Sequence, residues 1–172
     1  MVTATQVDID HLRAVAGAVS DPEIPVLTLS DLGIVRDVRW GQGDLAGTVL
    51  VELTPTYTGC PATEVIAADV IAALRAAGAD RVRVRTVLAP AWTTDWISPD
   101  GRRKLREYGI APPGAGRPAG TGPRGVALTL SVRCPRCGSG RTREVSRFGA
   151  TPCQSHWTCQ SCLEPFDSFK AI

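Results

Sequence analysis

The sequence predicts a mixed α/β fold of the α+β type, in which a small mixed sheet with flanking helices is followed by a small all-β zinc ribbon. Three observations support this prediction. Helix-like and strand-like periodicities follow one another in the order α-β-β-α-β-α over residues 1–110. A run of proline, glycine and small residues occupies 111–125 and predicts a linker. Two Cys-x-x-Cys pairs then lie in residues 126–172, the expected zinc ribbon.

Composition and charge narrow the class of protein. The chain has 172 residues, of which 44% are hydrophobic and 21% charged, as in ordinary globular proteins. No apolar run approaches the roughly 18 residues of a membrane span, and the N-terminus lacks the basic-then-apolar pattern of a signal peptide. We therefore expect a cytoplasmic chain with no membrane partner, in which the 6 cysteines serve as metal ligands or redox groups rather than disulfides.

The charge is divided unevenly along the chain. Residues 1–110 carry 11 basic and 14 acidic side chains, a net −3, whereas residues 111–172 carry 8 and 3, a net +5. A basic tail can meet nucleic acid, an acidic partner protein or the acidic first domain of the same chain, and charge alone does not choose among them.

The first domain opens with a predicted amphipathic helix, because apolar residues recur at helical spacing between Ile9 and Val19. Two prolines in Asp21-Pro22-Glu23-Ile24-Pro25 exclude a helix there and predict an ordered loop that presents two carboxylates. The alternative for this loop is a polar turn whose acids only cap or solvate. Residues 29–33 are expected to form a short helical turn that leads into the first strand.

Two strands and a helix are expected next. Strand-like runs at 34–40 and 49–53 flank the turn at 41–44 and predict an antiparallel hairpin. The alanine-rich run at 62–77 predicts a helix that packs on the sheet. Its inner side is expected to comprise Val65, Ile66, Val70, Ala73 and Leu74.

A third strand is expected at 81–88, where arginines alternate with apolar residues. Its arginine-lined face is either a solvated sheet face or an anion site. Beyond it, Trp92 and Trp96 are expected to close an edge of the core or, alternatively, to face a partner, and a short basic helix is expected at 101–108.

The loop from Thr54 to Pro61 holds the only cysteine in the first 133 residues. Because proline favours the first helical position, Pro61 predicts that Cys60 is the N-cap of the following helix. The helix dipole and the free N–H groups at that position favour a thiolate. Cys60 is therefore a candidate metal ligand or reactive thiol; the alternative is a small buried residue that happens to precede a helix.

The tail contains the pattern C-x2-C-x21-C-x2-C, which is typical of a zinc ribbon. The four predicted ligands of one structural Zn²⁺ are Cys134, Cys137, Cys159 and Cys162. An iron–sulfur cluster on the same four thiolates remains an alternative. Gly138 suits the tight turn after the first pair, whereas Leu163 takes the position where a glycine would be easier in the second.

A unit as small as this tail has too little core to fold alone, so a bound metal is expected to supply much of its stability. The expected core around the metal comprises Phe148, Trp157, Phe166 and Phe169. Two further residues fall outside the cysteine pairs. Cys153 is an unassigned thiol, and His156 is expected on the surface.

Three motifs of the first domain, in their order along the chain, resemble the iron–sulfur-assembly domain family that includes SufT. They are Asp21-Pro22-Glu23-Ile24-Pro25, Asp31-Leu32-Gly33 and Thr56-x-x-x-Cys60-Pro61. The segment from Trp92 to Trp96, the run at 101–113 and the tail from 146 to 169 resemble the PaaD family, whose members belong to the bacterial phenylacetyl-CoA epoxidase system. The resemblance implies a role in aerobic phenylacetate degradation, with the oxygenase and reductase subunits of that system as partners.

The oxygenase chemistry is expected on another chain. This sequence has only His11 and His156, no Glu-x-x-His pair and no dinucleotide-binding loop. The resemblance therefore implies an accessory subunit, not catalytic by itself, that assists iron or iron–sulfur cluster maturation of the oxygenase or reductase. Cys60, with Thr56, Asp21 and Glu23 near it, is the candidate for holding or transferring iron or a cluster transiently, and the ribbon is the candidate for docking the client.

Two other functions remain open at this point. One is a nucleic-acid-binding zinc-ribbon protein, favoured by the basic tail. The other is a thiol redox enzyme that uses Cys60 with Cys153. Whether two copies of the chain pair as a homodimer is also open.

Overall fold

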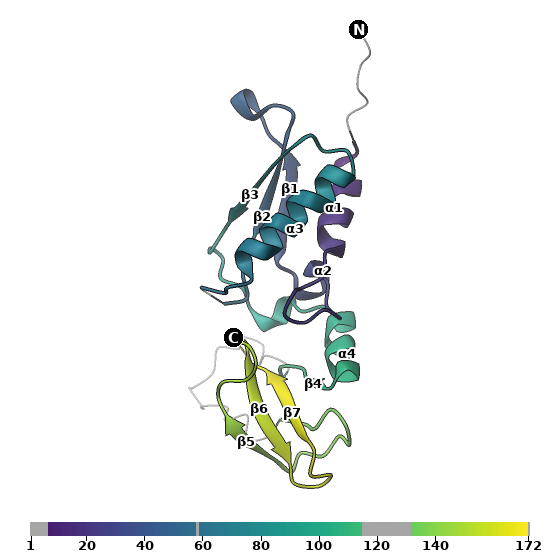
Figure 1. Ribbon diagram of the computed structural model, residues 1–172, viewed down its shortest axis with the longest axis vertical. Coiled ribbons are helices and arrows are strands. Elements are labelled where there is room, and N and C mark those ends of the chain that lie inside the picture. The colour runs from purple at the N-terminus through teal and green to yellow at the C-terminus, as the bar shows by residue number, and fades with distance from the viewer. Residues whose placement is uncertain (1–6, 58, 115–131, 172) are drawn as a thin grey trace, which may run out of the picture. The chain divides into compact units, whose positions relative to one another are not determined.

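The computed structural model describes residues 7–57, 59–114 and 132–171, which form two compact units that divide between Trp92 and Thr93 (Figure 1). The sequence places the boundary at 110/111 instead. Residues 93–111 belong with the second unit because β4 (Ile110–Ala111) pairs in parallel with β7 (Pro165–Phe169) of the ribbon. Ala111, assigned to the linker by its sequence context, is buried in that strand. The rest of the predicted linker, at 115–125, and most of the strand-like run after it lie outside the described residues.

The first unit is a three-stranded mixed sheet with helices packed against it. Its elements are α1 (Ile9–Ala18), α2 (Leu29–Leu32), β1 (Val35–Trp40), the 3₁₀ turn η1 (Gly43–Leu45), β2 (Thr48–Leu53), α3 (Thr63–Ala76) and β3 (Arg81–Thr86). The strand order is β1-β2-β3, with an antiparallel first pair and a parallel second pair. The predicted element order and hairpin are therefore confirmed, and α3 provides the crossover between the two parallel strands.

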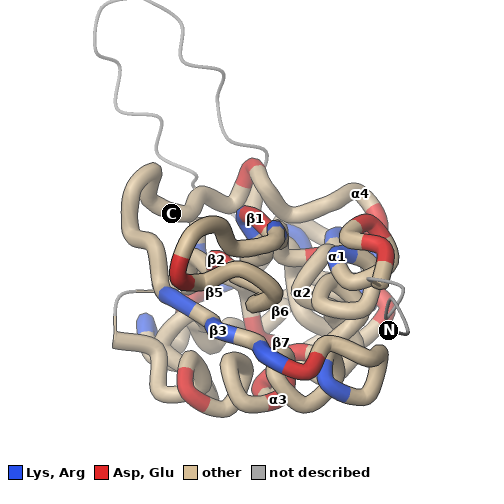
Figure 2. Tube along the Cα trace, turned by 90° about the horizontal axis from the view of Figure 1, so that it is seen from above, with Lys and Arg blue, Asp and Glu red and all other residues tan. Residues whose placement is uncertain are grey.

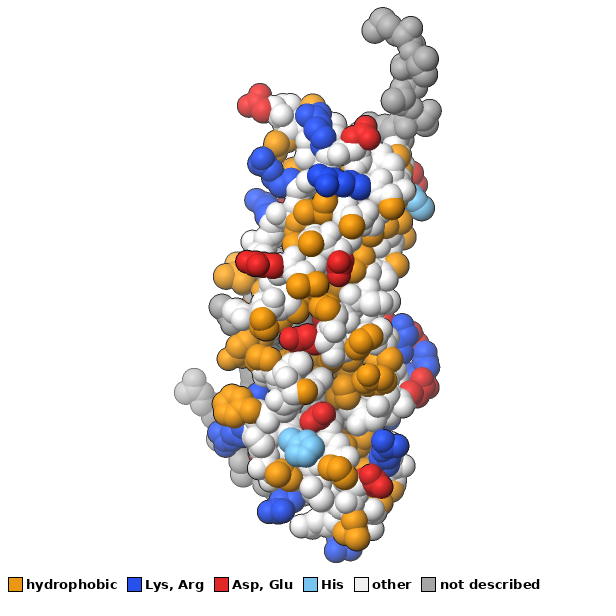
Figure 3. Space-filling model, in the orientation of Figure 1, with side chains coloured by type: hydrophobic (Ala, Val, Ile, Leu, Met, Phe, Trp, Pro, Cys, Tyr) orange, Lys and Arg blue, Asp and Glu red, His pale blue; other side chains and the backbone are white. Residues whose placement is uncertain are grey.

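The core of this unit lies between the sheet and the two longer helices. Ile66, Val70 and Leu74 of α3 are buried against it, whereas Val65, expected on the same side, is 49% exposed. One residue step turns an α-helix by about 100°, so Val65 lies off the buried stripe. The outward side of α3 also carries Ala68 and Ala72, and hydrophobic side chains are visible on the surface over this helix (Figure 3).

The opposite face of the sheet is polar and carries the predicted arginines, which alternate along β3 (Figure 2). Glu52 of β2 accepts hydrogen bonds from Arg39 at 2.6 Å and from Arg85 at 2.5 Å. These two guanidinium groups lower the pKa of Glu52. Arg85 is thus committed to an ion pair within the sheet, as expected of a solvated sheet face.

Trp92 closes an edge of the first unit's core, as predicted. Its side chain is buried, and its indole N–H donates to the carbonyl oxygen of Leu32 at 2.8 Å. A 3₁₀ turn, η2 (Thr94–Trp96), follows in the second unit, where Trp96 is half-buried. The helix α4 (Pro99–Tyr108) begins at an N-capping Ser98 with proline in its first turn and ends at Gly109, whose φ of 95° requires a residue without a side chain.

The second unit contains α4 and a four-stranded sheet in the order β4-β7-β6-β5, in which β5 (Thr142–Ser146) and β6 (Gln154–Cys159) pair antiparallel. Phe166 and Phe169 are buried, and Trp157 packs against the core cluster. The prediction that Phe148 belongs to this core is wrong, because the chain turns outward after β5 and leaves its ring 77% exposed. No helix among the described residues has the length and hydropathy needed to cross a bilayer.

Candidate metal centre and transfer site

The four cysteines of the ribbon lie close together. Their sulfur atoms are all within 4.8 Å of one another. The Cys134 and Cys162 Sγ atoms are 3.7 Å apart, and those of Cys137 and Cys159 are 3.6 Å apart. A tetrahedral ion that holds thiolates at about 2.3 Å separates them by about 3.8 Å, so this donor set fits a single metal ion.

Two similar turns present these sulfurs. In the first, the N–H of Gly138 donates to the carbonyl oxygen of Cys134, and in the second that of Leu163 donates to the carbonyl oxygen of Cys159. Gly138 and Leu163 both adopt left-handed backbone conformations, with φ of 74° and 67°. This conformation strains leucine but not glycine, and packing does not offset the strain because the leucine side chain is 77% exposed.

The electrostatics of the four thiols favour a cation. Backbone N–H groups of Cys162 and Ser161 lower the pKa of Cys159 to about 6. The N–H of Glu164 lowers the pKa of Cys162, but burial and the three neighbouring sulfurs outweigh it and raise that pKa to about 12. Four adjacent thiols therefore do not all ionise by themselves, whereas metal ligation stabilises all of them as thiolates.

The other predicted thiol site, at Cys60, differs from its prediction in one respect. Helix α3 begins at Thr63 with Ala62 as N-cap, so Cys60 lies two residues outside the cap. The reason is that the N–H and hydroxyl of Thr63 both donate to the carbonyl oxygen of Cys60, at 3.2 and 2.9 Å, which closes a separate turn before the helix. The side chain of Cys60 is half-buried.

The structure does bring Cys60 together with the two predicted carboxylates. Burial raises the pKa of the Cys60 thiol, and the nearby charges of Glu23 and Asp21 raise it further, against a smaller opposing effect of the Ala62 N–H. The thiolate expected from a helix-cap position is therefore disfavoured in the absence of a cation. Thr63 also hydrogen-bonds this thiol and was missed in the sequence, although a threonine three residues after a cysteine is a readable signal.

The two carboxylates have different surroundings. Asp21 is 9% exposed, and its Oδ1 accepts the N–H groups of Glu23 and Ile24 at 2.9 and 2.7 Å, which holds the loop in shape. Glu23 is half-buried, and burial together with the charge of Asp21 raises its pKa. Thr56, also predicted at this site, is half-buried in the same loop as Cys60. Asp21 thus shapes the loop, while Glu23 is the freer carboxylate.

Only one ready-made ligand cluster exists in the part of the chain that the structure describes. There the four ribbon cysteines alone form a group of three or more His, Cys, Asp or Glu side chains close enough to share an ion. Cys60 with its carboxylates is an open, incomplete set. Cys153 is buried, with its Sγ 3.0 Å from the Thr151 hydroxyl, and His156 is half-buried with its Nδ1 3.1 Å from Asp167 Oδ1.

An α/β unit that presents one cysteine beside two carboxylates, joined to a four-cysteine ribbon, defines the class: an iron–sulfur-assembly-type domain with a metal-binding ribbon. Two family models match accordingly, that of an iron–sulfur cluster assembly protein over residues 10–86 and that of the PaaD zinc beta ribbon domain over residues 121–170. The chain is 45% identical over 173 residues to a protein of Escherichia coli (strain K12) that is named as one of the subunits of 1,2-phenylacetyl-CoA epoxidase, covering 100% of this chain and 98% of that one. It belongs to the PaaD family.

The first unit has further relatives of its own. A protein of Porphyromonas gingivalis (strain ATCC BAA-308 / W83) named as an Fe-S protein maturation auxiliary factor is 34% identical over 88 residues, which cover 51% of this chain and 80% of that protein. The crystal structure of a domain of unknown function, DUF59, from Bacillus anthracis matches with a TM-score of 0.50 and 27% identity over 56% of this chain and 90% of that chain. These matches agree with the α/β fold predicted for this unit.

Proposed function

We propose that the chain is an accessory subunit of the phenylacetyl-CoA epoxidase system in aerobic phenylacetate degradation, where it assists iron or iron–sulfur cluster maturation of the oxygenase or reductase. Membership of the PaaD family supports the place in that system. The assembly-type first unit supports the maturation role. The observation that carries the proposal is the grouping of Cys60 with Glu23 and Asp21, which come from loops far apart in the sequence.

Iron is the cargo of this site rather than a resident cofactor. A thiolate and carboxylate oxygens are both iron ligands, and a set that stays incomplete leaves positions for the ligands of a client protein. Glu23 and Asp21 attract a cation, which in turn displaces the thiol proton of Cys60. Return of the proton favours release, so the same groups serve both loading and delivery.

The alternative of a thiol redox enzyme receives no support from the site. A nucleophilic cysteine requires a lowered pKa, whereas burial and two carboxylates raise the pKa of Cys60. The second thiol proposed for that chemistry, Cys153, is buried.

For the ribbon we propose one structural Zn²⁺ ion on Cys134, Cys137, Cys159 and Cys162. The short distances between the sulfurs suit a single ion, whereas the thiolates of a four-iron cluster bind different irons and lie farther apart. Four protein ligands leave no open position, so the ion stabilises the fold and takes no part in catalysis. Metal analysis of the purified chain should find about one zinc per molecule; iron with visible absorption would overturn this assignment.

The maturation role is tested by the iron content of the client proteins. We expect oxygenase and reductase produced together with the wild-type chain to be loaded with iron, and those produced with the Cys60→Ala variant to be depleted. Tyr57→Phe is the matched control, since this half-exposed residue lies in the same loop and keeps the thiol and both carboxylates. Equal loading with Cys60→Ala and wild type would refute the role of Cys60.

One observation favours a second candidate, a nucleic-acid-binding ribbon. The exposed ring of Phe148 lies 5.0 Å from Lys170 Nζ, and Arg143 and Arg147 are exposed nearby in the sequence. An exposed aromatic ring beside basic residues can stack on a base, a contact of about 1–3 kcal/mol. Binding of single-stranded DNA or RNA that weakens with salt and with Phe148→Ala would support this candidate, and salt-insensitive or absent binding would exclude it.

A further inference from the structure

A cavity of about 390 Å³ lies within the second unit, beside the first cysteine turn of the ribbon. It is lined by Arg106 of α4, by residues 112–114 after β4, and by residues 132–135 together with Gly138. This volume falls in the range of about 300–1,000 Å³ that is typical of binding pockets. Neither the proposed zinc site nor the transfer site at Cys60 accounts for it.

The lining combines apolar walls with positive charge. Pro112, Pro113, Pro135 and Val132 supply flat apolar surface, whereas Arg106 and Arg133 supply two guanidinium groups. No aspartate or glutamate is among the lining residues that the structure describes. A guanidinium group offers a planar fork of N–H donors that matches a carboxylate, and apolar walls beside it favour a ligand that also has apolar groups.

Neighbouring arginines hold this cavity in shape. Arg102 donates to the carbonyl oxygen of Pro113 at 2.8 Å and to that of Thr94 at 2.6 Å, which fixes one wall against α4. Arg136 reaches the C-terminal end of α4, where its Nη2 is 3.8 Å from the position of a Cβ on Gly109. That end of a helix favours a cation. These two side chains therefore have structural roles, which leaves Arg106 and Arg133 for a ligand.

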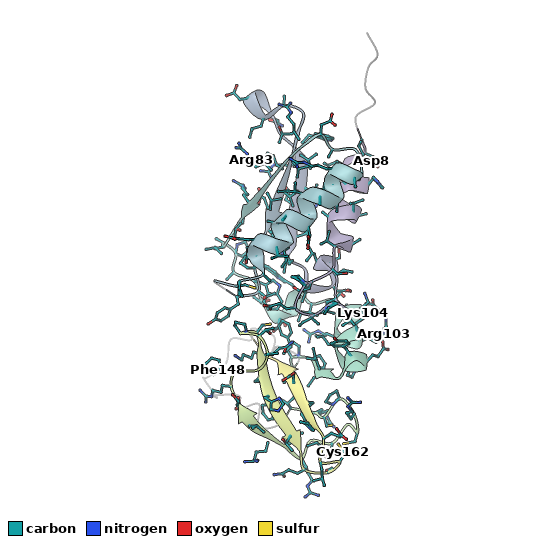
Figure 4. All side chains as sticks on the ribbon, viewed as in Figure 1. Asp8, Arg83, Arg103, Lys104, Phe148 and Cys162 are labelled. Carbon is teal, nitrogen blue, oxygen red and sulfur yellow. The ribbon has the colours of Figure 1, made fainter. Side chains whose placement is uncertain are left out.

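The charge of Arg106 is not matched by an ion pair with any residue that the structure describes, and Arg133 donates only to the carbonyl oxygen of Gly138, at 3.2 Å. Arg103 of the same helix provides the contrast, since it pairs with Asp100 at 2.5 Å and Glu107 at 2.7 Å. Figure 4 shows Arg103 and Lys104 on the side of α4 turned away from the ribbon strands. Among the described residues, cationic charge without a partner is therefore concentrated at the cavity.

We propose that this cavity receives an acidic segment of a partner protein that carries an apolar side chain next to its carboxylates. Charge complementarity identifies the occupant's sign, and the proline-rich walls favour a peptide over a simple anion, which would leave them unused. The chain's own segment at 115–131 is a poor occupant, because it contains Arg117 and Arg124 and no acidic residue. Only the identity of the partner, an oxygenase or reductase subunit, rests on the proposed function.

A structural explanation competes with this one. Cys134 lines the cavity, and four thiolates around a divalent ion carry a net negative charge that nearby arginines can balance. In that case Arg106 and Arg133 retain the metal and bind no partner. The two explanations predict different losses when the charge is reversed, namely partner binding in one and metal in the other.

The test uses the full chain, purified with its metal, and measures its affinity for the purified oxygenase and reductase subunits and for overlapping peptides that cover them. Arg106→Glu and Arg133→Glu should each weaken binding by about tenfold, retain the metal, and be rescued by an acidic-to-lysine change in the bound segment. Arg103→Glu, on the same helix, should bind as the wild type does. Hydrogen exchange of the complex should show protection at residues 112–114 and 132–138.

Three results would overturn the proposal: wild-type affinity in both cavity variants, equal loss in the Arg103→Glu control, or loss of the metal in place of loss of the partner. Binding to a second copy of the chain, or to no protein and no peptide, would also overturn it. Failure of the proposed function is distinguishable, because Cys60→Ala leaves the cavity intact. If that variant binds the partner and loads it with iron normally, the maturation role fails while the docking site stands.

Discussion

Cysteines occupy opposite environments in the two units. In the ribbon, four sulfurs surround one point and complete a coordination shell from the chain's own residues. In the α/β unit, one half-buried sulfur lies beside two carboxylates and completes nothing. The difference separates keeping an ion from passing one on, since a closed set binds tightly and leaves no opening, whereas an open set must share the ion with other ligands.

The charges around the sulfurs follow the same division. N–H groups lower the pKa of Cys159 to about 6, so the ribbon holds a thiolate before any metal arrives. Burial, Glu23 and Asp21 raise the pKa of Cys60. A cation must therefore displace a proton at Cys60, which makes binding there weaker and more dependent on pH.

Removal of the metal should produce the largest difference between the units. A structural zinc ion contributes apparent free energies of about 10–16 kcal/mol in small domains, so a strong chelator should unfold β5, β6 and β7. The first unit has its own apolar core and should remain folded. Amide hydrogen exchange measured along the chain checks this; continued protection of β6 and β7 without metal would show that the ribbon folds without an ion.

Relief of backbone strain in the second cysteine turn should have the next largest effect. Leu163→Gly should stabilise the metal-loaded chain by about 1–2 kcal/mol, because glycine adopts the left-handed conformation without steric cost. Little packing is lost, since the leucine side chain is 77% exposed. Denaturant unfolding measures the change. Gly138→Ala in the other turn is the matched control and should destabilise by a similar amount.

The pKa of Cys60 should respond to its carboxylates. Because Glu23 raises that pKa, Glu23→Gln should lower it, increase the thiolate fraction and speed alkylation of Cys60 by iodoacetamide severalfold near pH 8. Peptide mapping by mass spectrometry measures the rate. Asp44→Asn, in the turn at the other end of β2, should leave the rate unchanged. Slower alkylation of Glu23→Gln would contradict the electrostatic arrangement.

The smallest effect is expected on the open face of the sheet. Arg39 and Arg85 lower the pKa of Glu52, so the ion pairs contribute stability above the carboxyl's ordinary pKa and lose it as the pH falls through the lowered value. Glu52→Gln should cost at most about 1 kcal/mol at neutral pH, since both arginines are largely exposed. Denaturant unfolding at pH 7 and pH 3 checks this. A larger cost at pH 3 than at pH 7 would reverse the assigned sign.

Corrections to the predictions arise where a residue's environment depends on distant parts of the chain. Phe148 has the sequence signature of a core residue, but the turn after β5 directs it outward. Cys60 precedes a proline and a helix, but the Thr63 side chain closes its own turn and the helix starts later. The boundary after residue 110 is plausible from composition, but β4 pairs with a strand more than 50 residues further along.

The sequence by itself determined the order of the helices and strands, the cysteine spacing of the ribbon and the candidate residues of both sites. Periodicity, proline and glycine positions and ligand spacing act between near neighbours, so they can be read along the chain. Only the tertiary structure decided that Glu23 and Asp21 act on Cys60, that the Cys60 thiol stays protonated, that Leu163 takes a left-handed conformation and that an arginine-lined cavity lies beside Cys134. Burial and charge depend on which distant segments pack together, and no local pattern encodes that.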